Sequence, residues 1–343
     1  MTTELWMRID IRGAGIAASS RELCAAAIDQ AVWADDNGFD AILFAEHHGT
    51  ADGYLPSPKI MAAAVAARTK CIRLQLGALI LPLSNPLRIA EDVAVLDNIS
   101  NGRVDITVGV GYVPSEFAMM GVDMKKRPSL TEEGITALRA AFTGEPFEFR
   151  GRKVRVTPKP VQPGGPEIMH AGAVPASALR AARFCDGFFP TVVTPELLAI
   201  YRDECARVGK QVGRIVDMTG PSSIHVSHNP ERDWPRVAPH MMHEINTYGR
   251  WSRESGTLTN YTFPEAKDIA GLKAIGAHHV FTPDECLAFL QNKRANNTSF
   301  IFNPLCGGIH PDIAWESLRL MEHEVLPRFK HVPVSRGNQR NNS

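Results

Sequence analysis

The sequence lacks the features that mark several large classes of protein. Its 37 basic residues are balanced by 37 acidic ones, and no run of like charge dominates, so no nucleic acid or membrane surface is expected as a partner. It has no run of 18 consecutive apolar residues, so no transmembrane helix is expected. The opening residues, MTTELWMRIDIRG, lack the apolar stretch of a signal peptide.

Disulfide and metal-binding cysteine patterns are also missing. Six cysteines are scattered along the 343 residues without a Cys-x-x-Cys pair, which favours reduced thiols in a cytoplasmic protein. Apolar residues make up 44% of the chain and charged residues 22%, as in ordinary globular proteins. This length can form one large α/β domain.

Short apolar runs alternate with helical patterns along most of the chain. In the helix expected over 20–37, Leu23, Ala27 and Ala31 share one face, and Gly38 ends it. Eight such strands, the last within 298–308, predict the α/β class and a (β/α)8 TIM barrel over 1–331. A doubly wound open sheet would show the same alternation and stays open as the alternative.

Three segments interrupt this rhythm. Residues 146–166 are rich in Pro and Gly and predict a surface hairpin around Arg150 and Gly151. Residues 229–276 are expected as an insertion between strands 7 and 8. Residues 332–343 form a polar tail. In the part 229–263 the share of aromatic residues is about twice the chain's 7%. These aromatic residues are Trp234, Tyr248, Trp251, Tyr261 and Phe263. They predict that this part is a lid over a site, or else a subdomain or subunit contact.

The stretch LFAEHHGT, residues 43–50, ends an apolar strand in Glu46, His47 and His48. A strand interior is a poor place for a carboxylate and two imidazoles. In a barrel, however, the carboxyl ends of the strands form the active face, so these side chains are expected to meet a ligand there. A hydrogen-bonded cluster without chemistry is the alternative. A metal site is not expected, because adjacent histidines in a strand diverge.

Four separated motifs occur in a recognisable order. They are FDAILFAEHH, LGALILPLSNPLRIAEDVAVLDNISNGRVDITVGVGY, HAGAVPASALRAARFCDGFF and PLCGGIHPDIAWESLRLMEHEVLPRF. Over about residues 35–330 the chain resembles the bacterial luciferase-like, flavin-dependent monooxygenases, most specifically from Pro82 to Arg103. The resemblance implies a (β/α)8 barrel that receives reduced FMN from a separate NAD(P)H-dependent flavin reductase. It also implies that O2 oxygenates a small apolar organic substrate through a flavin hydroperoxide.

The resemblance assigns roles to the residues at the end of the second strand. It implies that His47 is the catalytic residue beside the flavin, with His48 as its partner and Glu46 orienting a ring. Protons must be supplied or withheld on time in such chemistry, and an imidazole with an ordinary pKa of about 6.5 is suited to that. Gly77 and Ala78 align with a backbone bulge behind the flavin ring, often with a non-proline cis peptide; packing in a crowded barrel is the alternative.

Two further segments are expected to bind the flavin. Small residues at the end of the fourth strand let a ligand approach the chain, and the helix that opens near Pro175 offers N–H groups to a phosphate. The residues assigned here are Gly109, Gly111, Ala171, Gly172, Ala173, Val174 and Ser177; an ordinary strand–helix turn is the alternative. The family often has an arginine where this chain has Val110, so Arg150, Arg180 and Arg183 stay open as substitutes.

Two other functions fit the same barrel. A deazaflavin-dependent (F420-type) oxidoreductase transfers hydride without O2, but such relatives more often carry Asp-His where this chain has Glu46-His47. A non-catalytic flavin-binding relative is the other alternative, and the presence of His47 disfavours it. A homodimer is expected. The substrate cannot be named, because it contacts the loops that vary most.

Overall fold

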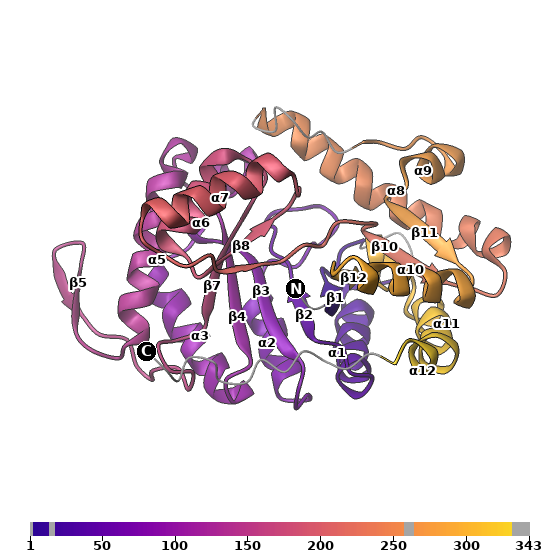
Figure 1. Ribbon diagram of the computed structural model, residues 1–343, viewed down its shortest axis with the longest axis horizontal. Coiled ribbons are helices and arrows are strands. Elements are labelled where there is room, and N and C mark those ends of the chain that lie inside the picture. The colour runs from indigo at the N-terminus through magenta and orange to yellow at the C-terminus, as the bar shows by residue number, and fades with distance from the viewer. Residues whose placement is uncertain (1–2, 14–17, 257–263, 331–343) are drawn as a thin grey trace. The chain divides into compact units, whose positions relative to one another are not determined.

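The computed structural model describes residues 3–13, 18–256 and 264–330 (Figure 1). The described chain forms two compact units. Unit 1 contains the residues up to Leu43, His47–Pro56 and those from Met218 onward, and unit 2 contains Phe44–Glu46 and Ser57–Asp217. Each unit is described by itself. Tyr261, Phe263 and the expected tail 332–343 lie outside the described residues.

Unit 2 is a parallel sheet flanked by helices. Strand β4 (Val104–Gly109) is buried along its whole length and pairs in parallel with β3 (Arg73–Ile80) and β7 (Glu167–Gly172). It is buried along its length because parallel strands are covered on both faces. Its two polar side chains, Asp105 and Thr107, accept hydrogen bonds from side chains of β3. The strand order is β3-β4-β7-β8-β9, completed by β8 (Gly187–Pro190) and β9 (Arg214–Ile215).

Helices follow the strands of unit 2, and most of them pack against one another in chain order. Helix α3 shows why they start where they do: the Asn85 side chain accepts from the Leu87 N–H at 2.9 Å and Pro86 occupies the first turn. The helices are α2 (Pro58–Ala66), α3 (Pro86–Ser100), α4 (Pro114–Met119), α5 (Arg127–Phe142), α6 (Pro175–Phe184) and α7 (Pro195–Arg207), with short 3-10 turns η1 (Leu81–Leu83) and η2 (Met124–Lys126).

The predicted surface hairpin is confirmed in unit 2. Strands β5 (Phe147–Phe149) and β6 (Arg152–Val154) pair antiparallel and project away from the sheet in Figure 1. Arg150 and Gly151 form the turn with φ of 50° and 71°. Positive φ at both turn residues matches the twist of a two-residue hairpin.

Unit 1 contains the first and last strands of the chain. Strand β1 (Leu5–Ile9) pairs in parallel with β12 (Phe300–Phe302) and is followed by β2 (Ala41–Phe44), whose last residue belongs to unit 2. Helix α1 (Ser20–Asp36) is confirmed, and Ser19 caps it in a reciprocal pair with Glu22. The remaining elements are η3 (Cys306–Gly308), α9 (Ile269–Ile275), α10 (Pro283–Ala295), α11 (Pro311–Leu320), the π-helical turn η4 (Met321–Val325) and α12 (Leu326–Phe329).

The segment that interrupts the rhythm is mainly a helix. Helix α8 (Pro230–Ser255) buries an apolar stripe that includes Trp234, Val237 and Met241, at the spacing of a helix face. After it, β11 (His278–Phe281) pairs in parallel with β10 (Ser223–Val226), forming a two-stranded sheet that the sequence pattern did not indicate.

Candidate functional site

The carboxyl end of β3 carries the expected backbone irregularity. The register with β4 shifts between Gly77 and Leu79, and the Gly77–Ala78 peptide is cis. The expected bulge is therefore present. Glu46 lies against the same segment, since its Oε2 accepts a hydrogen bond from the Ile80 N–H at 2.7 Å. The acidic residue of the Glu-His-His motif is thus anchored to the main chain at the end of β3.

The glycines that end β4 lie close to this bulge. A Cβ on Gly109 would lie 3.1 Å from the Cβ of Ala78, and one on Gly111 would lie 2.7 Å from Cγ2 of Ile80. Gly111 also has φ of 74°, which favours glycine. The close approach of the two strand ends therefore requires glycine at Gly111 and leaves little room at Gly109.

The segment after β7 forms a tight turn into α6. A Cβ on Gly172 would lie 2.5 Å from the Cβ of Ser177. The Ser177 hydroxyl donates to the Val174 carbonyl at 2.6 Å and accepts from the Val174 N–H at 3.3 Å. Ser177 is buried, whereas Ala171, Gly172 and Ala173 are half-buried and Val174 is exposed. The hydroxyl thus shapes the turn, and the accessible part is the chain of 171–174.

The three arginines left open by the sequence differ in their surroundings. Arg150 is exposed in the β5–β6 turn and pairs with Glu133. Arg183 is also exposed and pairs with Glu204. The Arg180 side chain is only 11% exposed, pairs with Glu132 at 2.9 Å, and donates to the Ala176 carbonyl at the start of α6 at 3.4 Å. Arg180 is therefore the one of the three whose guanidinium reaches back to the amino end of this helix.

A buried imidazole lies close to Arg180. His170, on β7, is fully buried. Burial, and next the charge of Arg180, lower the pKa of His170 to about 3, so this side chain is neutral at physiological pH. The positive charge on this side of unit 2 comes from the arginine and not from the histidine.

His47 lies in an aromatic cluster within unit 1. Its side chain is buried, with the ring stacked on Trp251 at 4.4 Å between centroids and with the edge of Tyr54 at 4.6 Å. The main-chain N–H of His47 donates to the Leu55 carbonyl at 3.2 Å. His48 is half-buried. The motif therefore gives its two histidines different surroundings, as expected for neighbours in an extended chain.

A buried hydrogen-bond network adjoins this cluster. Arg8 donates to the hydroxyls of Tyr54, at 2.8 Å, and Tyr248, and the two hydroxyls lie 2.8 Å apart. Burial is the main cause that raises the pKa of both tyrosines, so they remain protonated. The hydroxyls of Tyr54 and Tyr248 can therefore act as hydrogen-bond donors, on rings that themselves lie against His47.

A second charged group extends the network. Asp52 accepts from Arg12 at 2.9 Å and contacts Nε2 of His243 at 2.8 Å. Burial alone would raise the pKa of Asp52, but the His243 hydrogen bond and the Arg12 charge outweigh it and hold that pKa below its ordinary value. Asp52 thus stays ionised although it is buried.

Sequence reasoning missed most of this network. Arg8 lies in the first strand and Arg12 follows three residues after the end of that strand. Asp52 and Tyr54 follow the histidines within seven residues. That proximity to Glu-His-His was the available signal. Tyr248 and Trp251 belong to the aromatic segment already singled out, and their spacing of three places them on one helix face.

Comparison with known proteins establishes the family. Residues 5–279 match the model of the luciferase-like monooxygenases, and the chain belongs to that family. This confirms the resemblance drawn from the sequence motifs.

The relatives include two proteins named as monooxygenases or their oxygenase component. The 4-hydroxyprotoasukamycin monooxygenase of Streptomyces nodosus is 26% identical, over 88% of this chain and 86% of its own. The oxygenase component of the trigonelline monooxygenase of Acinetobacter baylyi is also 26% identical, over 88% and 89%. The protein y4vJ of Sinorhizobium fredii is 31% identical, but the match spans about half of each chain, 51%.

Solved structures confirm the barrel fold. The oxygenating constituent of the 3,6-diketocamphane monooxygenase of Pseudomonas putida, in complex with FMN, has a TM-score of 0.70 at 19% identity, covering 97% of this chain and 100% of that one. An F420-dependent secondary alcohol dehydrogenase also gives a TM-score of 0.70, at 14% identity, covering 96% of this chain and 100% of that one.

The described residues contain no helix both long and apolar enough to cross a membrane.

Proposed function

We propose that this chain is the oxygenase of a two-component system. It receives reduced FMN from a separate NAD(P)H-dependent reductase and uses O2 to oxygenate a small apolar organic substrate. The observation that carries the proposal is the Glu46 carboxylate bound to the Ile80 N–H beside the Gly77–Leu79 bulge. It links the Glu-His-His motif to the main chain that a flavin ring would contact. The two relatives that match over most of their length are named as a monooxygenase and as the oxygenase component of one, which supports oxygen chemistry.

The residues of unit 2 fit a flavin. A flat ring against main chain needs small side chains. Gly77, Ala78, Gly109 and Gly111 supply them at or just past the carboxyl ends of β3 and β4. The accessible chain 171–174 at the start of α6 would receive the phosphate. We assign the missing phosphate arginine to Arg180, because its guanidinium folds back toward that helix start.

The proposed catalytic residue is His47. When bound, reduced FMN supplies the electrons that activate O2. The stacked Trp251 and the edge of Tyr54 fix the plane of the His47 ring, and a ring nitrogen holds or donates a proton in that fixed position. Glu46 acts as a positioning residue through the main chain, and His48 as a partner of His47. The aromatic rings of α8 exclude water from His47.

A hydride-transfer reaction is the second possibility. The F420-dependent alcohol dehydrogenase has the same fold, and fold alone does not decide the chemistry. The two reactions differ in the cofactor that the chain must bind and in their need for O2. The proposed function therefore requires a cofactor test before a substrate test.

An anaerobic titration tests the cofactor. We expect saturable quenching of intrinsic fluorescence by reduced FMN at lower concentration than by oxidised FMN, with weak or no response to reduced deazaflavin. The matched comparison is riboflavin, which lacks the phosphate. Tighter binding of reduced deazaflavin than of reduced FMN would overturn the proposal in favour of hydride transfer.

A further inference from the structure

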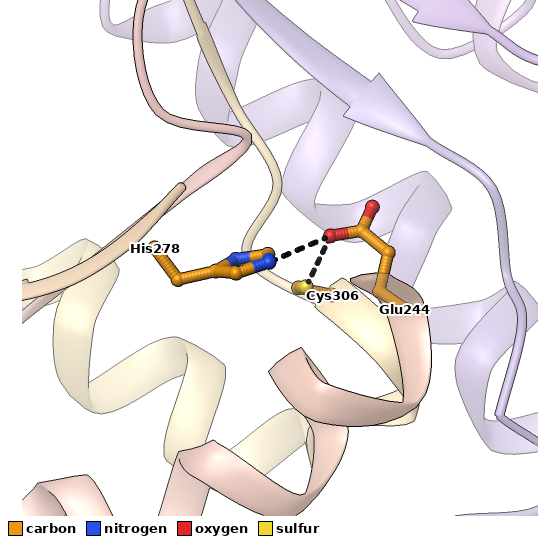
Figure 2. Close-up of side chains that lie close together, drawn as sticks. All are labelled: Glu244, His278 and Cys306. Carbon is orange, nitrogen blue, oxygen red and sulfur yellow. Dashed lines mark hydrogen bonds and ion pairs between the residues drawn. The ribbon is translucent and has the colours of Figure 1, made fainter. Parts of the chain in front are cut away.

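Three buried side chains converge within unit 1. Glu244 projects from α8, His278 begins β11 and Cys306 begins η3 (Figure 2). Oε2 of Glu244 lies 3.1 Å from Sγ of Cys306 and 3.6 Å from Nε2 of His278. One ligand atom from each residue lies within 4.8 Å of the others. Each of the three residues is 1% exposed or less.

The imidazole in this cluster lacks hydrogen-bond partners. Within the described residues, neither Nδ1 nor Nε2 of His278 has one, although the residue is 1% exposed. Buried polar atoms are nearly always hydrogen-bonded, and the 3.6 Å contact between Nε2 and the Glu244 carboxylate is too long for a hydrogen bond, so an ion or another group would satisfy the ring. Figure 2 shows the imidazole edge turned toward the Glu244 carboxylate and the Cys306 sulfur.

The separations fit a shared metal ion. With metal–ligand bonds of about 2.0–2.3 Å and tetrahedral angles, two ligand atoms lie about 3.3–3.6 Å apart. The observed separations of 3.1 and 3.6 Å fall at or near that range. The ligand atoms of Cys306 and His278 lie within 4.8 Å of each other, so side-chain shifts on three different elements would bring all three atoms to bonding distance.

The other carboxylate oxygen is already held in place. Oε1 of Glu244 lies 3.2 Å from Nη1 of Arg8 and accepts from Nδ2 of Asn303 at 3.4 Å. Oε2 is the oxygen that faces Cys306 and His278. A ligating carboxylate is commonly oriented by such outer contacts. The arrangement therefore leaves one oxygen for a metal and fixes the other.

We propose that Glu244, His278 and Cys306 bind one zinc ion. A thiolate, an imidazole and a carboxylate together favour Zn²⁺ over Mg²⁺ or Ca²⁺, which prefer oxygen ligands. On binding, the Cys306 thiol releases its proton to solvent, and the thiolate and carboxylate balance the two charges of the ion. Water completes the coordination.

The proposed zinc would join three separate segments of unit 1. It would fasten α8 to β11 and to the turn after β12. Tyr248 and Trp251 follow Glu244 by four and seven residues, so they lie on the same helix face. Zinc at Glu244 would thereby fix the helix whose Trp251 stacks on His47. This structural role requires no assumption about the reaction, so it can be tested independently of the proposed function.

The test uses the full chain unfolded with chelator and refolded with Co²⁺ or Zn²⁺, because the cluster is buried. The expected result is one metal ion retained per chain after gel filtration, and an intense thiolate-to-cobalt charge-transfer band. Cys306→Ser should remove the band and weaken affinity by more than about 100-fold, beyond the 10–100-fold typical of outer-shell losses.

The matched control is Cys286→Ser. Cys286 is an equally buried thiol, but it lies against Met321, with 3.6 Å between the two sulfurs. This variant should keep the band and the stoichiometry. If Cys306→Ser does not fold, His278→Gln serves in its place. Refolded wild-type chain that retains no metal, or a charge-transfer band equally strong in Cys306→Ser, would overturn the proposal.

Discussion

Gly111 gives the sharpest energetic prediction, because its substitution can be compared with a matched glycine. In Gly111→Ala the new Cβ would lie 2.7 Å from Cγ2 of Ile80 and 2.9 Å from Cε2 of Phe117. Gly121 has a similar φ, 66° against 74°, but a Cβ there would meet nothing within 4 Å. The pair therefore separates the cost of contact from the cost of conformation.

The magnitudes follow from these two terms. A left-handed conformation costs an L-residue roughly 1–2 kcal/mol, while alanine lowers the entropy of the unfolded chain and returns about 0.4–1 kcal/mol. Gly121→Ala should therefore reduce the free energy of unfolding by about 1 kcal/mol. Gly111→Ala adds overpacking against Ile80 and Phe117, worth about 1–3 kcal/mol, for a total of about 2–4 kcal/mol.

Urea unfolding of both variants is the assay. The denaturation midpoint should fall further for Gly111→Ala, with the slope against denaturant unchanged. Reduced FMN affinity should also fall in Gly111→Ala but not in Gly121→Ala, because only the former disturbs the main chain near Ile80. Equal midpoints for the two variants would refute the argument that close approach requires glycine at Gly111.

Three further predictions concern charge and proton transfer. His47→Ala should leave the far-ultraviolet circular dichroism unchanged, cut oxygenation by about 10²–10⁴-fold and release hydrogen peroxide; unchanged coupling of O2 to product would make His47 structural. Arg180→Gln should weaken FMN binding in titration but not riboflavin binding, while Arg183→Gln should affect neither; equal losses for both ligands would exclude a phosphate contact. Because the folded pKa of Asp52 lies below its unfolded value of about 3.9, its stabilisation is full above that value and is lost as pH falls through the folded pKa. Asp52→Asn should therefore lower the unfolding midpoint at pH 7 and flatten its dependence below about pH 4; an unaltered acid profile would show that Asp52 is not paired.

The alternation of strands and helices was predictable because each element satisfies its own local rules. Strand β4 has apolar residues at alternate positions, which is a local strand signal. Helix α3 starts with Asn85 and Pro86, which satisfy or remove N–H groups at its amino end. The hairpin at Arg150 and Gly151 follows from the same local chemistry. Such signals come from neighbours in sequence, and they need no knowledge of what packs against them.

The elements after β10 were harder to predict for physical reasons. Helix α8 contains Pro235 and Pro239 within its length, and proline normally ends a helix, so packing of its apolar stripe outweighs the local signal. Strand β11 begins with His278 and His279, which do not resemble an apolar buried strand. β11 is a strand because it pairs with β10.

The candidate site shows the same division. Glu46 and the Gly77–Ala78 bulge could be located from the sequence motif, but the bond from the Ile80 N–H to Glu46 could not. Nor could the sequence bring Arg8 to Tyr248, because those residues are 240 positions apart. Contacts at that separation depend on the completed fold, and they surround His47 with groups that no local pattern indicates.

The most direct test of the proposed function is isotopic. The full chain, supplied with NADH, FMN and a flavin reductase, should be incubated under ¹⁸O2 with a panel of small apolar aldehydes and ketones. We expect product that carries one atom of ¹⁸O, formed by the wild-type chain and lost in His47→Ala. Oxidation of a substrate that proceeds without O2, or product free of label, would contradict the proposed function.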